Sequence, residues 1–240
     1  MDTHTPDGLQ NSFEQNLIDS NEIDVLVSNY FLAGSALFTP NHHGRTFTIM
    51  RHPIDLAQSL FHYRQTASWE RSYRQKWSTW NFEGYVKSEY YMSNWMVRQL
   101  TGTMPNEILN ETHLERAKEV VRTKIFVGIS TQLEETIRQL QLYYGWEEQK
   151  PFCAFNFINA PTNANHHPKL ERGGEVWSAV AEIEKWDLAL YYYSLELFSG
   201  QRERFPPPTS VEESVIGVAP VVGEPKNGQN SRNMLHVISK

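Results

Sequence analysis

The chain has 240 residues, a formal net charge of -6, and a hydrophobic content of 40% that includes 7 Trp, 11 Tyr and 12 Phe. This length suits one domain with a substantial core, and the composition excludes an intrinsically disordered chain. The negative charge argues against a general nucleic-acid-binding protein, which normally presents a basic face.

The first part of the chain predicts two strands separated by a short helix. Residues 1–21 are polar and acidic without periodicity, so they predict an irregular leading segment and not a signal peptide. Apolar residues alternate over Ile23–Val27, which indicates a short strand, and the apolar run Phe31–Phe38 indicates a short helix. A second strand is expected at Arg45–Met50.

The segment after the second strand has the features of a phosphate site. Arg51 lies at the strand's carboxyl end, and Pro53 suits the first position of a helix because its φ is already helical. The unpaired N–H groups of that helix N-terminus favour an anion, and the Arg51 guanidinium offers a planar set of donors to phosphate oxygens. Ser59, further along the helix, adds a hydroxyl. The core-facing side of this helix is expected to consist of Ile54, Ala57, Leu60 and Phe61.

The middle of the chain predicts a loop and then a helix. Residues 69–84 are rich in Trp and Arg without clear periodicity, which favours a loop. Trp69, Trp77 and Trp80 are expected to be core residues more than ligand-stacking residues. A helix is expected over residues 85–100.

A capping box is predicted at Thr112, with Glu115 three residues later, for a helix that runs to about Arg122. This gives Thr112 a structural reason to be present. The glycosylation sequon Asn110-Glu111-Thr112 is therefore discounted.

The next predicted elements are a strand at Lys124–Ile129 and a helix that ends at Gly145. Thr131 and Glu134 form a second predicted capping box at the start of this helix.

The last third of the chain predicts a loop, a helical region and a tail. Residues 150–174 contain repeated Asn, Pro, His and Gly, which favours a loop. A helical region over 176–200 is expected to break at Asp187, which would otherwise lie on the apolar face and which would cap the second piece. Residues 205–240 are rich in Pro and Gly without a period, so they predict a disordered tail.

The sequence gives little support for a disulfide-bonded protein, a membrane-spanning protein or a metalloprotein. Cys153 is the only cysteine, so no intramolecular disulfide forms, which mildly favours a reducing compartment. No apolar run approaches the roughly 18 to 20 residues of a membrane span. The pairs His42-His43 and His166-His167 lack the spacing that places two ligands on one helix face, so no metal site is expected.

Strands followed by helices predict an α/β domain at residues 22–204, with a parallel sheet covered by helices on both faces. Ligands of such sheets bind outside the carboxyl ends of the strands. Arg51 is expected at one of these ends.

The pattern Arg51-x-Pro53-x5-Ser59 after a strand resembles the 3′-phosphate-binding motif of the sulfotransferases that use 3′-phosphoadenosine 5′-phosphosulfate (PAPS). The run RHPIDLAQSLFHYRQTASWE resembles the polysaccharide and membrane-associated branch of that superfamily. KIFVGISTQLEETIRQLQLYYGW is similar to the family's "VGL…EES" element, and HHPKL with WDLALYYYSLELFSGQ to its closing loop and helix. The resemblance covers residues 23–204.

This resemblance implies a sulfotransferase-like P-loop NTPase fold and an enzyme that transfers a sulfuryl group from PAPS to a hydroxyl of a carbohydrate or similar acceptor. Arg51 and Ser59 would bind the 3′-phosphate, and Lys169 and Arg172 lie in a loop that in the family approaches this phosphate. The resemblance also implies the Golgi or secretory lumen, although the chain shows neither a signal peptide nor an anchor.

The chain departs from the family pattern in three places. Nothing before Ile23 offers the Gly- and Lys-containing loop that holds the 5′-phosphosulfate, so the fold is expected to be incomplete at its N-terminal edge. Residues 28–31 contain no histidine to serve as base, and Leu56 stands where related motifs often carry arginine. Two interpretations stay open: a truncated enzyme, and a non-catalytic nucleotide-binding or interaction module of the same fold.

Overall fold

The computed structural model describes residues 2–20, 22–70, 73–146, 168–205 and 234–237. The helices and strands of these residues follow one another as α1 Pro6–Glu14, β1 Val25–Ser28, α2 Phe31–Ser35, β2 Arg45–Met50, α3 Pro53–Thr66, η1 Gln75–Thr79, α4 Phe82–Val86, α5 Trp95–Thr101, α6 Glu111–Lys124, β3 Ile125–Ile129, η2 Ser130–Gln132, α7 Leu133–Tyr144, α9 Glu175–Ile183, α10 Lys185–Arg204 and β4 Met234–Val237, where η marks a 3-10 helix.

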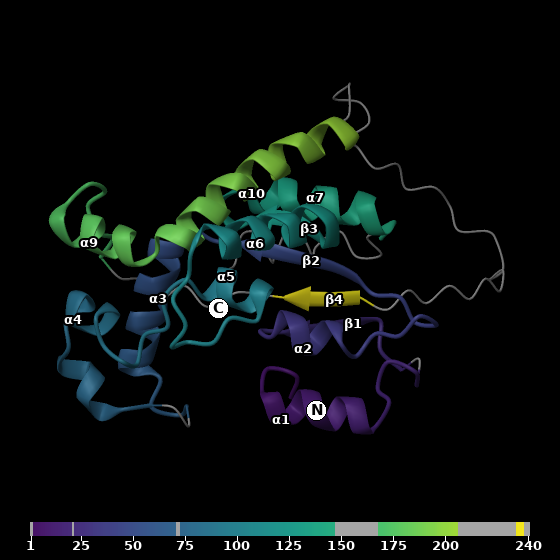
Figure 1. The fold of residues 1–240 in the computed structure, drawn as a ribbon, viewed down its shortest axis with the longest axis horizontal. Helices are drawn as coiled ribbons and strands as arrows, with labels where there is room; N and C mark the ends of the chain where they lie inside the picture. Colours follow the sequence, from purple (N-terminus) through teal and green to yellow (C-terminus); the bar gives the residue numbers. More distant parts are fainter. Residues whose placement is uncertain (1, 21, 71–72, 147–167, 206–233, 238–240) are drawn as a thin grey trace, which may run out of the picture.

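The described strands form one parallel sheet in the order β1-β4-β2-β3. The strand β3 reads IFVGI and is buried at every position, as expected for a strand with helices packed around it. The helices α6, α7 and α10 contact β3, and Figure 1 shows α10 running past this edge of the sheet. The prediction of an α/β fold with a parallel sheet is confirmed.

The predicted tail contains a strand. Residues 234–237 form β4, which lies between β1 and β2 and pairs with both. The prediction of a disordered tail at 205–240 is therefore wrong for these four residues, and the ordered domain does not end at residue 204. A strand this short shows no readable period, and its pairing depends on partners far away in sequence. The tail residues 206–233 and 238–240 lie outside the described residues.

The predicted irregular segment 1–21 contains the helix α1. Thr5 caps it, since the Thr5 side chain accepts the N–H of Gly8 at 3.0 Å, and Pro6 begins it. Leu9 and Ile18 are buried in the main core. The prediction of an irregular segment was wrong because only a few apolar residues of this polar segment pack against the domain, too few to show a helical period in the sequence.

The helix predicted over 85–100 is in fact two short helices, α4 and α5. Residues 87–94 separate them, and Asn94, directly before α5, has a φ of 53° in the left-handed region, which cannot continue a helix. The carboxylate of Glu184 accepts the Asn94 N–H at 3.1 Å, which holds this conformation. Because the residue that stabilises this interruption of the helix is distant in sequence, residues 85–100 alone do not predict it.

Both predicted capping boxes differ from those observed. The N-cap of α6 is Asn110, whose side chain accepts the N–H of His113 while the ring of His113 accepts the N–H of Asn110 at 3.2 Å. Thr112 lies inside the helix. The box predicted at Thr131 is absent because residues 130–132 form the 3-10 turn η2 ahead of α7.

The three tryptophans of residues 69–84 differ in burial. Trp77 is buried in η1 with 3% exposure, and Trp80 is partly buried. Trp69 is 73% exposed, so the expectation of a core residue is wrong there. Part of the predicted loop is helical, as η1 and the start of α4.

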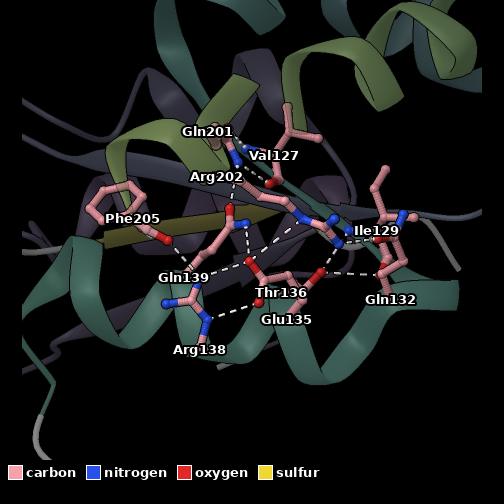
Figure 2. A network of polar contacts seen from close by, with 10 residues as sticks. All are labelled: Val127, Ile129, Gln132, Glu135, Thr136, Arg138, Gln139, Gln201, Arg202 and Phe205. Carbon is pink, nitrogen blue, oxygen red and sulfur yellow. Dashed lines mark hydrogen bonds and ion pairs between the residues drawn. The ribbon is translucent and has the colours of Figure 1, made fainter. Parts of the chain in front are cut away.

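Side chains from two helices close the free edge of β3, as Figure 2 shows. The amide of Gln201 on α10 accepts the N–H of Val127 at 3.1 Å and donates to the Val127 carbonyl at 2.8 Å, as a neighbouring strand would. The Thr136 hydroxyl on α7 makes the same pair of bonds with Ile129, at 2.9 and 3.1 Å. The edge of β3 is thus paired without another strand.

A glycine allows this close approach. A Cβ on Gly128 would lie 2.3 Å from the methyl group of Thr136, so a larger residue would displace α7 from β3. The network continues outward from Gln201, whose amide donates to Gln139 at 3.2 Å, and Gln139 in turn donates to the Glu135 carboxylate at 2.7 Å. Arg138 donates to the Glu135 carboxylate at 2.7 Å and to the Phe205 carbonyl at 2.6 Å.

Candidate functional site

The candidate site lies at the carboxyl ends of the strands. Figure 1 shows α3, α4 and α9 gathered on the side of the sheet toward which the arrow of β4 points. The predicted strand Arg45–Met50 and the predicted helix start at Pro53 are both confirmed. Ile54, Ala57 and Phe61 are buried, so the expected core-facing side of α3 is confirmed at these three residues; Leu60, the fourth, is only partly buried.

Arg51 directly follows β2 and is half-buried. It makes no hydrogen bond or ion pair with any other residue that the structure describes. Two other arginines that are not fully exposed have such partners: Arg64 donates to the Tyr85 hydroxyl at 2.7 Å, and Arg98 to the Ser93 carbonyl at 3.0 Å. The guanidinium of Arg51 therefore differs in having its donors available at the N-terminal end of a 14-residue helix.

His52 is the N-cap residue of α3 and is only 7% exposed. Its ring packs against three aromatic rings, among them Tyr191 at a centroid distance of 5.3 Å. Burial lowers the pKa of His52; the charge of Asp55 opposes this shift and that of Arg172 adds to it. The ring is thus neutral at neutral pH. Its Nδ1 is buried with no hydrogen-bond partner among the described residues, which is rare for a buried polar atom.

Ser59 lies in α3 and is half-buried. Its hydroxyl forms no hydrogen bond with a described residue, so it is not used to hold α3 in place. No hydrogen bond joins Ser59 to Arg51. Their joint action on one phosphate stays a prediction.

The loop before α9 lies against α3. The Gln58 side chain donates to the Pro168 carbonyl at 2.5 Å and fixes the described start of this loop. Lys169 is exposed, and its role stays a prediction. Arg172 is also exposed, yet its charge reaches His52 and lowers that residue's pKa. A contact of Arg172 with the phosphate, like one of Lys169, stays a prediction.

A cavity of about 310 Å³ lies beside α3. Its walls come from the loop after β1, from α3, from the segment before α5 and from the start of α10. The lining residues are Asn29, Tyr30, Pro53, Leu56, Ala57, Leu60, Arg64, Tyr90, Tyr91, Met92, Trp95, Glu184 and Asp187. Pro53 places this cavity two residues from Arg51.

Two helix N-termini cap each other beside this cavity. Asp187 on α10 accepts the N–H groups of Met96 and Val97 on α5, at 2.9 and 2.8 Å. In return the Asn94 side chain accepts the N–H groups of Trp186 and Asp187, at 2.9 and 3.1 Å. Asp187 was expected to cap its own helix; it caps α5 instead, and the break between α9 and α10 lies at Glu184.

The carboxyl groups of Glu184 and Asp187 are buried close together. Burial raises the pKa of Glu184, and the charge of Asp187 raises it further. Burial also raises the pKa of Asp187, opposed by the N–H groups that it caps. The Tyr91 hydroxyl donates to Glu184 at 2.7 Å, and burial raises the pKa of this tyrosine. This corner of the cavity therefore holds fewer negative charges than its carboxyl groups suggest.

Sequence reasoning missed this cavity. Its residues come from four separate segments, and each resembles an ordinary core or loop residue in the sequence. One local signal existed, since Asn29 and Tyr30 directly follow a strand whose carboxyl end faces the predicted ligand edge.

Within the described residues, no group of three or more His, Cys, Asp or Glu could hold a metal ion. The described helices include none with the length and apolarity to cross a bilayer. His166, His167 and Cys153 lie outside the described residues.

Comparisons with known proteins found no matching family model, no matching curated protein and no matching solved structure.

Proposed function

We propose that this protein binds the 3′-phosphate of PAPS at Arg51 and at the start of α3, and that it acts as a sulfotransferase on a hydroxyl of a carbohydrate or similar acceptor. The single observation that carries this proposal is the half-buried Arg51, which has no described partner and stands at the N-terminus of α3. Proline at the first helical position and arginine before it are the motif from which the resemblance was drawn.

Physical chemistry favours a dianion at this place. The free N–H groups of α3 and the helix dipole attract negative charge, and a guanidinium binds phosphate oxygens through paired donors. Leaving Arg51 half-buried without a counter-charge costs free energy, which a bound phosphate would recover. The unpaired Nδ1 of the buried His52 is a second polar atom at the same helix end with no internal partner.

The parallel sheet supports the proposal at a coarser level, because ligands of such sheets bind at the carboxyl ends of the strands. A P-loop NTPase-like fold is part of the proposal, and its 5′-phosphosulfate loop has no counterpart in the sequence before Ile23. In the reaction, the acceptor oxygen forms a bond to sulfur while the bond from sulfur to the nucleotide's phosphate oxygen breaks. The hydroxyl proton passes to a base, and adenosine 3′,5′-bisphosphate leaves.

A second candidate is a nucleotide-binding module of the same fold without catalysis. It is favoured by the residues after β1, where Asn29 and Tyr30 provide no histidine base. An assay of sulfate transfer from PAPS to a panel of acceptors separates the two, since both candidates bind the nucleotide and only the enzyme turns it over.

Isothermal titration calorimetry with adenosine 3′,5′-bisphosphate tests the binding step. The wild-type protein should bind one equivalent, and Arg51→Ala should lose about 1.5 kcal/mol or more, the scale of a hydrogen bond to a charged group. Arg51→Lys should fall between them because it keeps the charge and loses the paired donors.

Arg116→Ala is the matched control, since Arg116 is an exposed arginine of α6. It should bind as tightly as the wild-type protein. Equal affinity of Arg51→Ala and Arg116→Ala would remove Arg51 from the site and with it the basis of the proposal.

A further inference from the structure

We infer that Asn110, at the N-terminus of α6, is a site of N-linked glycosylation that is modified when the chain passes through the lumen of the endoplasmic reticulum. Asn110-Glu111-Thr112 is the only Asn-x-Ser/Thr sequon of the chain. Glycosylation of Asn110 does not depend on nucleotide binding, so it holds or fails apart from the proposed function.

The structure removes the reason for which this sequon was discounted. Thr112 was expected to cap the helix, but the cap is Asn110, and Thr112 is the second residue of α6. Thr112 is exposed, and its hydroxyl forms no hydrogen bond with a described residue. Threonine is also a poor helix former, so the helix alone gives no reason for it at this position. A sequon, by contrast, requires a hydroxyl residue here.

The cap uses only one of the two polar atoms of the Asn110 amide. Its Oδ1 lies 3.4 Å from the backbone nitrogen of His113 and 2.8 Å from the Nδ1 of the same residue. Its Nδ2, the atom to which a glycan is attached, makes no hydrogen bond with a described residue, and Asn110 is exposed. Because glycosylation leaves the amide carbonyl in place, a glycosylated Asn110 can still cap α6.

The modification is a group transfer from a lipid diphosphate-linked oligosaccharide, catalysed by an oligosaccharyltransferase. A bond forms between Nδ2 of Asn110 and the anomeric carbon of the first sugar. The bond between that carbon and the phosphate oxygen breaks, the lipid diphosphate leaves, and the amide gives one proton to a base.

The surroundings of Asn110 leave room for a glycan and surface for it to cover. Glu111 and Thr112 are both exposed, and Asn110 does not line the cavity beside α3. The preceding loop exposes two apolar side chains, Ile108 at 88% and Met104 at 59%. A bulky polar group attached two residues from Ile108 shields such surface and raises solubility.

The test expresses the full chain behind a cleavable signal peptide in a eukaryotic host, followed by treatment with peptide N-glycosidase. The wild-type protein should lose one glycan on treatment. Mass spectrometry should then find aspartate at position 110, because this hydrolysis converts a glycosylated asparagine to aspartate. Removal of the signal peptide establishes that the chain has reached the lumen.

Three substitutions separate the sequon from the helix cap. Thr112→Ala should abolish the glycan, and Thr112→Ser should retain it. Glu111→Pro should also abolish it, since proline at the middle position blocks the sequon while suiting the first position of α6. Asn106→Gln is the matched control at an exposed asparagine outside a sequon, and it should carry the glycan like the wild-type protein.

Thermal melts of unglycosylated protein from a bacterial host test the other explanation, a structural role of Thr112. Thr112→Ala should melt at or above the temperature of the wild-type protein, because alanine is the better helix former. If Glu111→Pro does not fold, the pair Thr112→Ala and Thr112→Ser decides the matter.

Three results would overturn the inference. The first is a wild-type chain whose signal peptide is removed and which carries no glycan. The second is a glycan that persists in Thr112→Ala. The third is a clearly lower melting temperature of Thr112→Ala, which would give Thr112 a task in the fold.

Discussion

The free edge of β3 and the carboxyl end of β2 use the same kinds of side chain in opposite ways. At the edge of β3, Arg138 is bonded to a carboxylate and a carbonyl, and both polar atoms of the Gln201 amide are bonded. At the carboxyl end of β2, Arg51 has no described partner and the Nδ1 of His52 is buried without a hydrogen-bond partner among the described residues. The first pattern holds the fold together; the second leaves polar atoms ready for a ligand.

This contrast predicts that changes in the two regions separate stability from binding. Residues of the edge network should matter for the free energy of unfolding and have little effect on affinity. Residues at the carboxyl end should do the reverse, because binding sites are commonly kept at some cost in stability.

The largest effect is expected at Gln201. Changing Gln201→Leu leaves the N–H and carbonyl of Val127 without partners, and each unpaired buried group costs about 1 to 3 kcal/mol. The free energy of unfolding, measured by urea denaturation, should fall by about 3 kcal/mol. Glu203→Gln, at an exposed position two residues away, is the control and should change little. A loss below about 0.5 kcal/mol for Gln201→Leu would mean that water pairs with this edge equally well.

An intermediate effect, which depends on pH, is expected at Glu184. Burial and the neighbouring Asp187 raise its pKa, so the folded protein keeps a proton that the unfolded chain has already released. The free energy of unfolding should therefore fall as the pH rises between about 5 and 8, by at most about 1.4 kcal/mol per pH unit for one proton.

Glu184→Gln removes this titration and should flatten the decline, as seen in urea denaturation at several pH values. The variant can keep hydrogen bonds to Tyr91 and Asn94, because an amide oxygen accepts as the carboxylate does. An equally steep decline in wild type and variant would place the proton elsewhere.

The smallest effect on stability is expected at Arg51. Since its guanidinium has no described partner, Arg51→Ala should change the free energy of unfolding by less than about 0.5 kcal/mol in the absence of ligand. A loss of 2 kcal/mol or more, well above that bound, would show that Arg51 is a structural residue like Arg138.

Elements with local signals were predictable from the sequence. The strand Arg45–Met50, the helix start at Pro53 and the stop at Gly145 follow from apolar runs, from proline geometry and from the left-handed φ of 67° at Gly145. The position of Arg51 at a strand end follows from the same signals. These features need no knowledge of distant residues.

Features that depend on distant partners were not predictable. Asp187 caps α5 across a sequence separation of 91 residues. The sequence predicted correctly that Asp187 caps a helix, but it predicted the wrong helix. The strand β4 lies between β1 and β2, far from both in sequence. The cavity is missed for the same reason, because its chemistry arises only when four segments meet.

The most direct test of the central claim is a thermodynamic cycle at Arg51. Calorimetry would compare adenosine 3′,5′-bisphosphate with adenosine 5′-phosphate on the wild-type protein and on Arg51→Ala. If Arg51 contacts the 3′-phosphate, the variant should lose about tenfold or more in affinity for the bisphosphate and almost nothing for the monophosphate. Equal losses for both nucleotides, or no loss for either, would contradict the account.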